Sequence, residues 1–310
     1  MHPIIRLVNR NLTISLNPGF LIWQIIFPLI YIFVAGFAYG PLINQVPFGG
    51  KELDYPAFLA SGMIGFNIMN STLISGILIW QIIFPLIYIF VAGFAYGPLI
   101  NQVPFGGKDL DYPAFLASGM IGFNIMNSTL ISGILIWNDR RHGMFEQIMS
   151  GPFTRSHYIL SNICTICIIG LVSASLIAVV GYPVIFQSAE FSLATIPILI
   201  FGAVVGSILF GSLASIISTR LRSSEGFNVI INTVFLFFAF VSSAFYPADT
   251  APEPLRTAFY LNPLTYLVDI IRAGIFGTIT EFVIYEMIIL ATLAAILFII
   301  ASKLLTRLDF

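Results

Sequence analysis

A few side chains in this chain have the types and spacing from which a chemical site is usually built. Cys164 and Cys167 are spaced as a C-x-x-C pair, but the sequence offers no second pair and no nearby histidine to complete four metal ligands. The histidines are His2, His142 and His157, and none has a cysteine or acid at a catalytic spacing. We therefore expect no catalytic residue and no metal ligand, and we interpret the cysteines as small buried apolar residues.

A phosphate-binding loop is the next candidate, because Gly49, Gly50 and Lys51 resemble the end of one. The full pattern requires a glycine five residues before the final glycine and a serine or threonine after the lysine. The chain has Gln45 and Glu52 at these positions. The sequence thus contains no nucleotide-binding loop, and we expect no cofactor-binding residue.

The composition indicates which solvent surrounds the chain. Of the 310 residues, 58% are hydrophobic and 9% are charged, and the mean hydropathy is +0.98. A soluble domain carries about 25% charged residues. The chain has too little polar surface for water, so we expect an integral membrane protein. The net charge of −1 supplies no basic face for nucleic acid, which excludes that partner.

Apolar segments between the charged residues are each close to the ~20 residues with which a helix crosses a bilayer. These segments predict an all-α, polytopic membrane fold that forms a single domain over residues 1–310. They lie at 20–41, 57–77, 78–97, 113–137, 158–186, 193–217, 227–247 and 283–302.

The distribution of the 13 Lys and Arg residues predicts the orientation. If the loop after the first span is outside, nine of them lie inside and four outside, which places both termini in the cytoplasm. Residues 1–19 have an apolar face formed by Ile4, Ile5 and Val8, and we expect a helix in the membrane interface there.

A block of 57 residues occurs twice, at 21–77 and 78–134, and differs only at Glu52 and Asp109. Diverged structural repeats are similar only in pattern, whereas near-identity indicates a recent duplication or an assembly error. Each copy holds two spans and one loop, so the extra copy preserves the downstream orientation. We therefore expect a six-span core with two extra spans.

The polar segment 138–156, which we call the coupling segment, is expected to form a short cytoplasmic helix. Asp139 is a candidate N-cap, and Gly151-Pro152 ends the helix. Met144, Phe145, Ile148 and Met149 form one apolar stripe that a partner protein could bind. An ordinary cytoplasmic loop with positive-inside arginines explains the same residues.

The segment 248–282, which we call the outer segment, is too long for a turn and too apolar for a solvated loop. Prolines divide it into short pieces, and Leu264 to Phe276 is too short to cross the membrane. We expect it to be a re-entrant or outer-leaflet helix covered by protein. Asp269 and Arg272 are three residues apart and are expected to pair on the surface of this helix.

Three motifs carry a resemblance to a known family. RRHGMFEQIMSGPFTR at 140–155 resembles the coupling region of ABC-2 type transporter permeases, the membrane subunits of bacterial and archaeal ABC exporters. SSAFYP at 242–247 and LNPLTYLVDIIR at 261–272 resemble the same family's signature near the fifth span. The resemblance covers the whole chain except the extra copy of the repeat, which departs from the six-span plan.

The resemblance implies a transport subunit that is not itself an enzyme. It implies a separate ABC ATPase that binds ATP and magnesium, a second permease copy or paralogue, an amphipathic exported substrate, and a plasma-membrane location. The implied ATPase-coupling residues are Arg140, Arg141, Gly143, Phe145, Glu146, Pro152 and Arg155. The implied residues of the outer segment and its flank are Pro247, Asn262, Pro263, Tyr266, Asp269 and Arg272.

Two other function classes would each need residues of a particular kind. A secondary transporter would place ionisable residues in its spans, where we expect asparagines but no buried acid. A membrane-embedded enzyme would need a catalytic cluster, which the histidines do not form. Asn124, Asn127 and Asn232 are a possible substrate pathway, although helix-to-helix hydrogen bonds are the commoner use of such residues.

Overall fold

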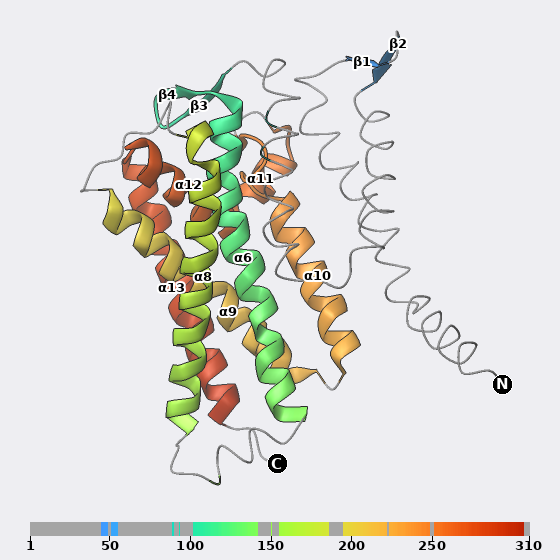
Figure 1. Ribbon diagram of the computed structural model, residues 1–310, viewed down its shortest axis with the longest axis vertical. Helices are drawn as coiled ribbons and strands as arrows, with labels where there is room; N and C mark the ends of the chain where they lie inside the picture. Colours follow the sequence, from blue (N-terminus) through green and yellow to red (C-terminus); the bar gives the residue numbers. More distant parts are fainter. Residues whose placement is uncertain are drawn as a thin grey trace, which may run out of the picture.

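The computed structural model describes residues 45–48, 51–54, 89, 93, 102–141, 150, 155–185, 195–221, 223–248 and 251–306. Its helices are α6 (Tyr112–Arg141), α8 (Arg155–Ile185), α9 (Ile196–Arg220), α10 (Ser224–Phe240), α11 (Leu255–Tyr260), α12 (Pro263–Phe276) and α13 (Glu281–Thr306) (Figure 1). Its strands are β1 (Gln45–Phe48), β2 (Lys51–Asp54), β3 (Val103–Phe105) and β4 (Lys108–Leu110).

Four of these helices are long and apolar enough to cross a membrane. The qualifying stretches are Tyr112–Ile131, Ser161–Val179, Ile196–Arg220 and Glu281–Thr306. They confirm the expected membrane protein and correspond to the spans expected at 113–137, 158–186, 193–217 and 283–302. Four expected elements lie outside the described residues, apart from positions 89 and 93. They are the interfacial helix and the spans at 20–41, 57–77 and 78–97.

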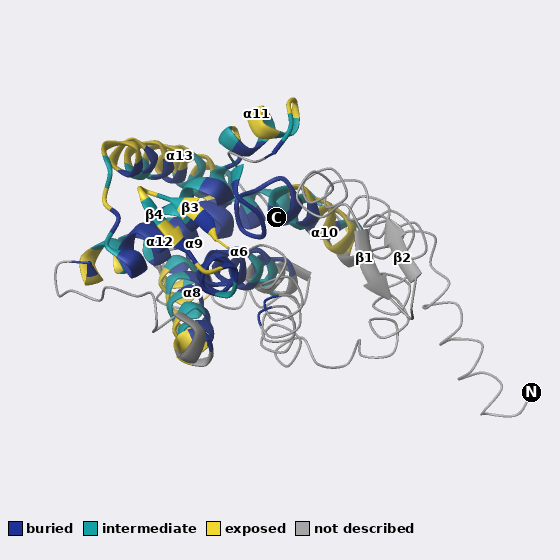
Figure 2. Ribbon diagram, turned by 90° about the horizontal axis from the view of Figure 1, so that it is seen from above, coloured by how far each residue is buried: buried dark blue, intermediate teal, exposed yellow. Residues whose placement is uncertain are grey.

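The helix α6 is the centre of the described bundle. It packs against α8, α9, α10 and α12, while α13 packs mainly against α9 and α12. Figure 2 shows the buried faces of these helices turned inward and the exposed faces of α8 and α13 turned outward. The outward faces carry large apolar side chains such as Val179 and Ile288, which suits contact with lipid.

The expectation that Cys164 and Cys167 are both buried is wrong. Cys164 is exposed and Cys167 is half-buried, and both are free thiols. Burying an apolar side chain stabilises a protein only when the side chain would otherwise contact water. An exposed side chain on α8 is expected to contact lipid, so a small apolar residue there need not be enclosed by protein.

Two β-hairpins depart from the all-α prediction. In β3–β4, Gly106 and Gly107 have φ angles of +57° and +82°, and two consecutive residues of this kind form the tight turn that matches strand twist. The repeated block forms the same hairpin in both copies: Phe48 pairs with Lys51 in β1–β2, as Phe105 does with Lys108 in β3–β4. Local turn residues thus determine this feature, which span lengths could not predict.

The seventh expected span, 227–247, has different bounds in the structure. The helix α10 ends at Phe240, and residues 241–247 form a buried turn. Side chains satisfy the backbone carbonyls that this early end leaves free. The Asn262 amide donates to the carbonyls of Phe238, at 2.8 Å, and Val241, and the Tyr246 hydroxyl donates to the carbonyl of Phe240.

Candidate functional site

The helix α12 has clear start and stop signals. The Asn262 side chain accepts a hydrogen bond from the backbone N–H of Leu264 at 2.9 Å, and Pro263 occupies the first turn. Gly277 ends the helix with a φ angle of +67°. Because the Asn262 amide also donates to the end of α10, this one residue joins the end of α10 to the start of α12.

The structure confirms the ion pair between Asp269 and Arg272, with 3.1 Å between Oδ1 and Nη1, but it corrects its location. Arg272 is fully buried rather than at the helix surface. Nε donates to Ser118 Oγ, Nη1 donates to Ser243 Oγ as well as to Asp269, and Nη2 donates to the carbonyls of Phe115 and Ala244. These long-range acceptors, from α6 and from the turn after α10, explain why the side chain points inward.

The Phe115 ring lies against the same guanidinium group. The centre of the ring is 3.6 Å from Arg272 Cζ, a cation–π contact between α6 and α12. Burial lowers the pKa of Arg272 to about 10, and Asp269 acts in the opposite direction. The guanidinium is therefore charged at neutral pH.

The two motifs at 242–247 and 261–272 contact each other directly. The backbone N–H of Ser243 donates to Thr265 Oγ1 at 3.3 Å, and Ser243 Oγ donates to Asp269 Oδ1 at 2.9 Å. The hydroxyl of Tyr266 donates to the carbonyl of Tyr260, which ties α12 to the end of α11. Pro247 is buried at the end of the turn. The outer residues expected from the sequence therefore lie at the same end of the bundle.

The β3–β4 hairpin packs on this end of the bundle, above α6 and α12 in Figure 1. Lys108 Nζ donates to the carbonyl of Phe276 at 3.0 Å, at the last residue of α12. A Cβ atom at Gly106 would lie 2.7 Å from the Cβ of Thr278, which shows how closely the hairpin approaches the α12–α13 connection.

A cavity of about 350 Å³ lies between the hairpin, the turn after α10, α12 and the start of α13. Asp269, Arg272 and Glu286 all line it. Glu286 is 2% exposed and lies in the second turn of α13, inside a candidate membrane span. The expectation of no buried acid is thus wrong. The signal in the sequence was a single carboxylate within the apolar run 283–302. It was missed because the run is long enough to predict a span whether or not it contains an acid.

At the opposite end of the bundle, a hydrogen bond joins α6 to α8. The Tyr158 hydroxyl donates to Asp139 Oδ2 at 2.9 Å. Asp139 lies within α6, which continues to Arg141, so its expected role as the N-cap of a separate helix is wrong. Of the expected coupling residues, Arg140 and Arg141 end α6 and Arg155 begins α8. The others, Gly143, Phe145, Glu146 and Pro152, lie outside the described residues.

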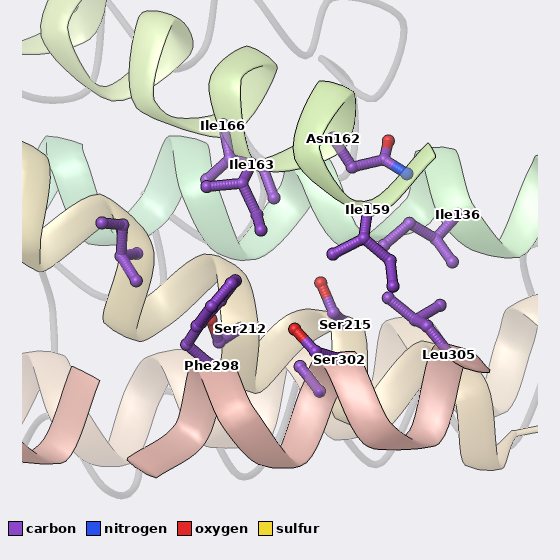
Figure 3. Close-up of a pocket in the computed structure, with 12 residues that line it drawn as sticks. Ile136, Ile159, Asn162, Ile163, Ile166, Ser212, Ser215, Phe298, Ser302 and Leu305 are labelled. Atoms are coloured by element: carbon purple, nitrogen blue, oxygen red, sulfur yellow. The ribbon is translucent and has the colours of Figure 1, made fainter. Parts of the chain in front are cut away.

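A small cavity lies near the same end, where α6, α8, α9 and α13 meet (Figure 3). Its volume of about 10 Å³ suits one water molecule and excludes a substrate. Figure 3 shows Ser215 and Ser302 turned toward this space. Ser302 Oγ and Asn162 Nδ2 are buried and have no hydrogen-bond partner among the described residues, so a water there would satisfy them.

The three asparagines proposed for a pathway have different surroundings. Asn124 is buried in α6, and its amide donates to the carbonyl of Ser173 in α8 at 3.3 Å. This is a helix-to-helix hydrogen bond of the kind that competes with a pathway role. Asn127 is half-buried in α6, and Asn232 is exposed on α10. A pathway through these residues remains a prediction.

Comparison with known proteins gives a consistent result. The family model described as ABC-2 type transporter matches residues 63–276, more than half of the chain. Nodulation protein J of Rhizobium leguminosarum bv. trifolii is 26% identical over 195 residues, covering 62% of this chain and 71% of that protein. A second nodulation protein J, from Rhizobium meliloti (strain 1021), is 24% identical over 225 residues, covering 72% and 83%.

A third relative is named for transport. It is the putative transport permease ycf38 of Cyanophora paradoxa, which is 27% identical over 208 residues, covering 65% of this chain and 67% of that protein. These matches agree with the apolar helices and with the motifs at 140–155 and 242–272. The chain therefore belongs to the ABC-2 type transporter family, and it is a membrane-integral transport permease.

Proposed function

We propose that this chain is the permease subunit of an ATP-driven exporter and is powered by a separate ABC ATPase. Family membership supports this role, and the chain's sequence has no phosphate-binding loop of its own. The ATPase would bind the coupling segment, 138–156, and would hold ATP and magnesium. A second copy or a paralogue would complete the pathway for an amphipathic substrate.

The observation that carries the proposal is the continuity of α6. The helix has 30 residues and therefore extends about 45 Å. Near one end its Phe115 contacts Arg272, and near the other its Asp139, inside the coupling segment, accepts a hydrogen bond from Tyr158 of α8. A displacement of that segment would move α6 and α8 together. Because α6 is one continuous helix, its far end would move as well and would shift its contacts with α12, as rigid-body coupling requires.

The proposed orientation has both termini in the cytoplasm of a plasma-membrane protein, with the β3–β4 hairpin and α12 on the outer side. At 14 residues, α12 is too short to cross the hydrocarbon core, so we propose that it is re-entrant. Its 11 buried residues support this, because protein covers it. A cysteine added after Phe310 should react with an impermeant reagent only from the cytoplasmic side, and labelling from outside would overturn the orientation.

The coupling role is tested by Glu146→Lys and Gly143→Pro in the complex with the ATPase. Both should lower the substrate exported per ATP hydrolysed at least tenfold, because they alter the charge or the backbone of the coupling segment. Thr306→Lys is the matched control, since it adds a positive charge at the exposed end of α13. If both variants export as much per ATP as the control, the coupling segment has another role.

A secondary transporter remains the alternative, and Glu286 is the observation that favours it. Acids within spans are typical of ion-coupled transport. Glu286 lies in the second turn of α13, near one end of its span, whereas coupling-ion sites lie near the midplane. Export from proteoliposomes that contain only this chain and a proton gradient would favour the alternative.

A further inference from the structure

Glu286 has an environment that the proposed transport cycle does not explain. Its side chain is 2% exposed and lines the cavity beneath the β3–β4 hairpin. Neither carboxylate oxygen has a hydrogen-bond partner among the described residues. Burying an ionised carboxylate without a partner costs several kcal/mol, so a site of this kind is suited to a bound ligand of opposite charge.

The neighbouring charges determine which kind of partner is favoured. Asp269 and Arg272 line the same cavity, and they form an ion pair with each other. The guanidinium group has five N–H donors, and they donate to Ser118, Ser243, Asp269, Phe115 and Ala244, so none of them is left for Glu286. With Glu286 ionised, the cavity carries one net negative charge, and it therefore attracts a cation and repels an anion.

The walls of the cavity favour an organic cation over a metal ion. Phe105, Phe115, Tyr260 and Phe282 all contribute to the lining. The rings of Tyr260 and Phe282 lie edge to face, with centroids 6.4 Å apart. Aromatic faces combined with a carboxylate are suited to an ammonium group. A divalent ion would instead require several oxygen ligands, and among the described lining residues Glu286 is the one carboxylate outside an ion pair.

We propose that this cavity is a binding site for the ammonium group of an organic cation, with Glu286 as its counter-ion and Tyr260 and Phe282 beside its apolar part. The volume of about 350 Å³ is sufficient for a small amine and lies within the range of ligand pockets. The site goes beyond the proposed export function and does not depend on coupling to an ATPase. The ammonium group can belong to a soluble amine or to a phosphatidylethanolamine headgroup.

Binding of benzylammonium chloride to the purified full chain in dodecyl maltoside tests the proposal. Saturation-transfer NMR should detect benzylammonium, and uncharged benzyl alcohol should bind at least tenfold more weakly, because only the ammonium group can pair with Glu286. This comparison uses the unmodified protein, so it does not depend on the folding of a variant. Equal binding of the two probes would overturn the proposal, and so would absence of benzylammonium binding.

Two variants then locate the site. Glu286→Gln should weaken benzylammonium binding at least tenfold, whereas Glu281→Gln, which neutralises an exposed acid on the same helix, should leave it unchanged. The melting temperature of Glu286→Gln should be at least that of the unmodified chain, since an unpaired buried charge is removed. Unchanged affinity in Glu286→Gln would place the amine elsewhere and would contradict the proposal.

The source of the ammonium group is distinguished by adding lipid to the same micelles. If phosphatidylethanolamine displaces benzylammonium while phosphatidylglycerol does not, a lipid headgroup occupies the site. If neither lipid displaces it, the site takes a soluble amine. Displacement by both lipids to the same extent would show that the ammonium group is not recognised, which contradicts the proposal.

Discussion

The guanidinium carbon of Arg272 lies 3.6 Å from the centre of the Phe115 ring, and Nη2 of the same arginine donates to the Phe115 carbonyl at 3.3 Å. Two residues 157 positions apart thus join α12 to the first turn of α6. The contact connects the short outer helix to the central helix of the bundle. A change at this contact should therefore destabilise the packing of α12 on α6.

Arg272→Met should destabilise the protein by roughly 3–5 kcal/mol, because it removes the positive charge that pairs with Asp269 and the guanidinium hydrogen bonds to two buried carbonyls. Arg272→Lys should recover only part of this loss, since one ammonium group cannot reproduce the geometry of the guanidinium. Denaturant unfolding of the purified protein in detergent measures both. Arg256→Met is the control, because that side chain is exposed on α11. A loss in Arg272→Met no greater than in the control would show that the buried contacts contribute little.

Gly119→Ala should destabilise the same region. A Cβ atom at this position would lie 2.0 Å from the Ala244 carbonyl oxygen and 2.9 Å from Arg272 Nη2, so α6 would have to move away from the turn after α10. Overpacking of this kind costs about 1–3 kcal/mol. In the control, Gly93→Ala, the nearest atom would be 3.4 Å away, an ordinary contact. Thermal unfolding of the two variants side by side gives the comparison, and equal melting temperatures would refute the close approach.

Deletion of residues 21–77 should leave an inserted and functional permease. The two copies differ at one position and form hairpins in the same register, so neither has specialised. The family match begins only at residue 63, and Phe20 followed by Leu78 would restore the original entry into the first span. The shortened chain should melt at or above the temperature of the full chain and should export equally with its ATPase. Loss of export with normal insertion would show that the extra copy has a function.

The sequence predicted the features that depend on local signals. Apolar length located the four candidate membrane spans, and the short apolar stretch from Leu264 to Phe276 corresponds to α12. The Asp269–Arg272 pair followed from its spacing within one helix turn. Each of these needs only residues that are close together in the chain.

The features that the sequence did not predict depend on distant residues. Arg272 is buried because carbonyls at Phe115 and Ala244 accept from it, and spacing within α12 contains no information about them. The end of α10 at Phe240 depends on the side chain of Asn262, more than twenty residues later. Glu286 was missed because the apolar run around it is long enough to predict a membrane-spanning helix without any attention to this one residue. A lone acid in such a run is nevertheless a signal of function.

The central claim is that this permease obtains its energy from a separate ATPase subunit. The most direct measurement is ATP turnover and substrate export in proteoliposomes that contain the rigorously purified chain, with and without its cognate ATPase. The account predicts no hydrolysis and no export by the chain alone, and ATP-dependent export when both subunits are present. Hydrolysis of ATP by the single chain, or export that is unchanged without the ATPase, would contradict it.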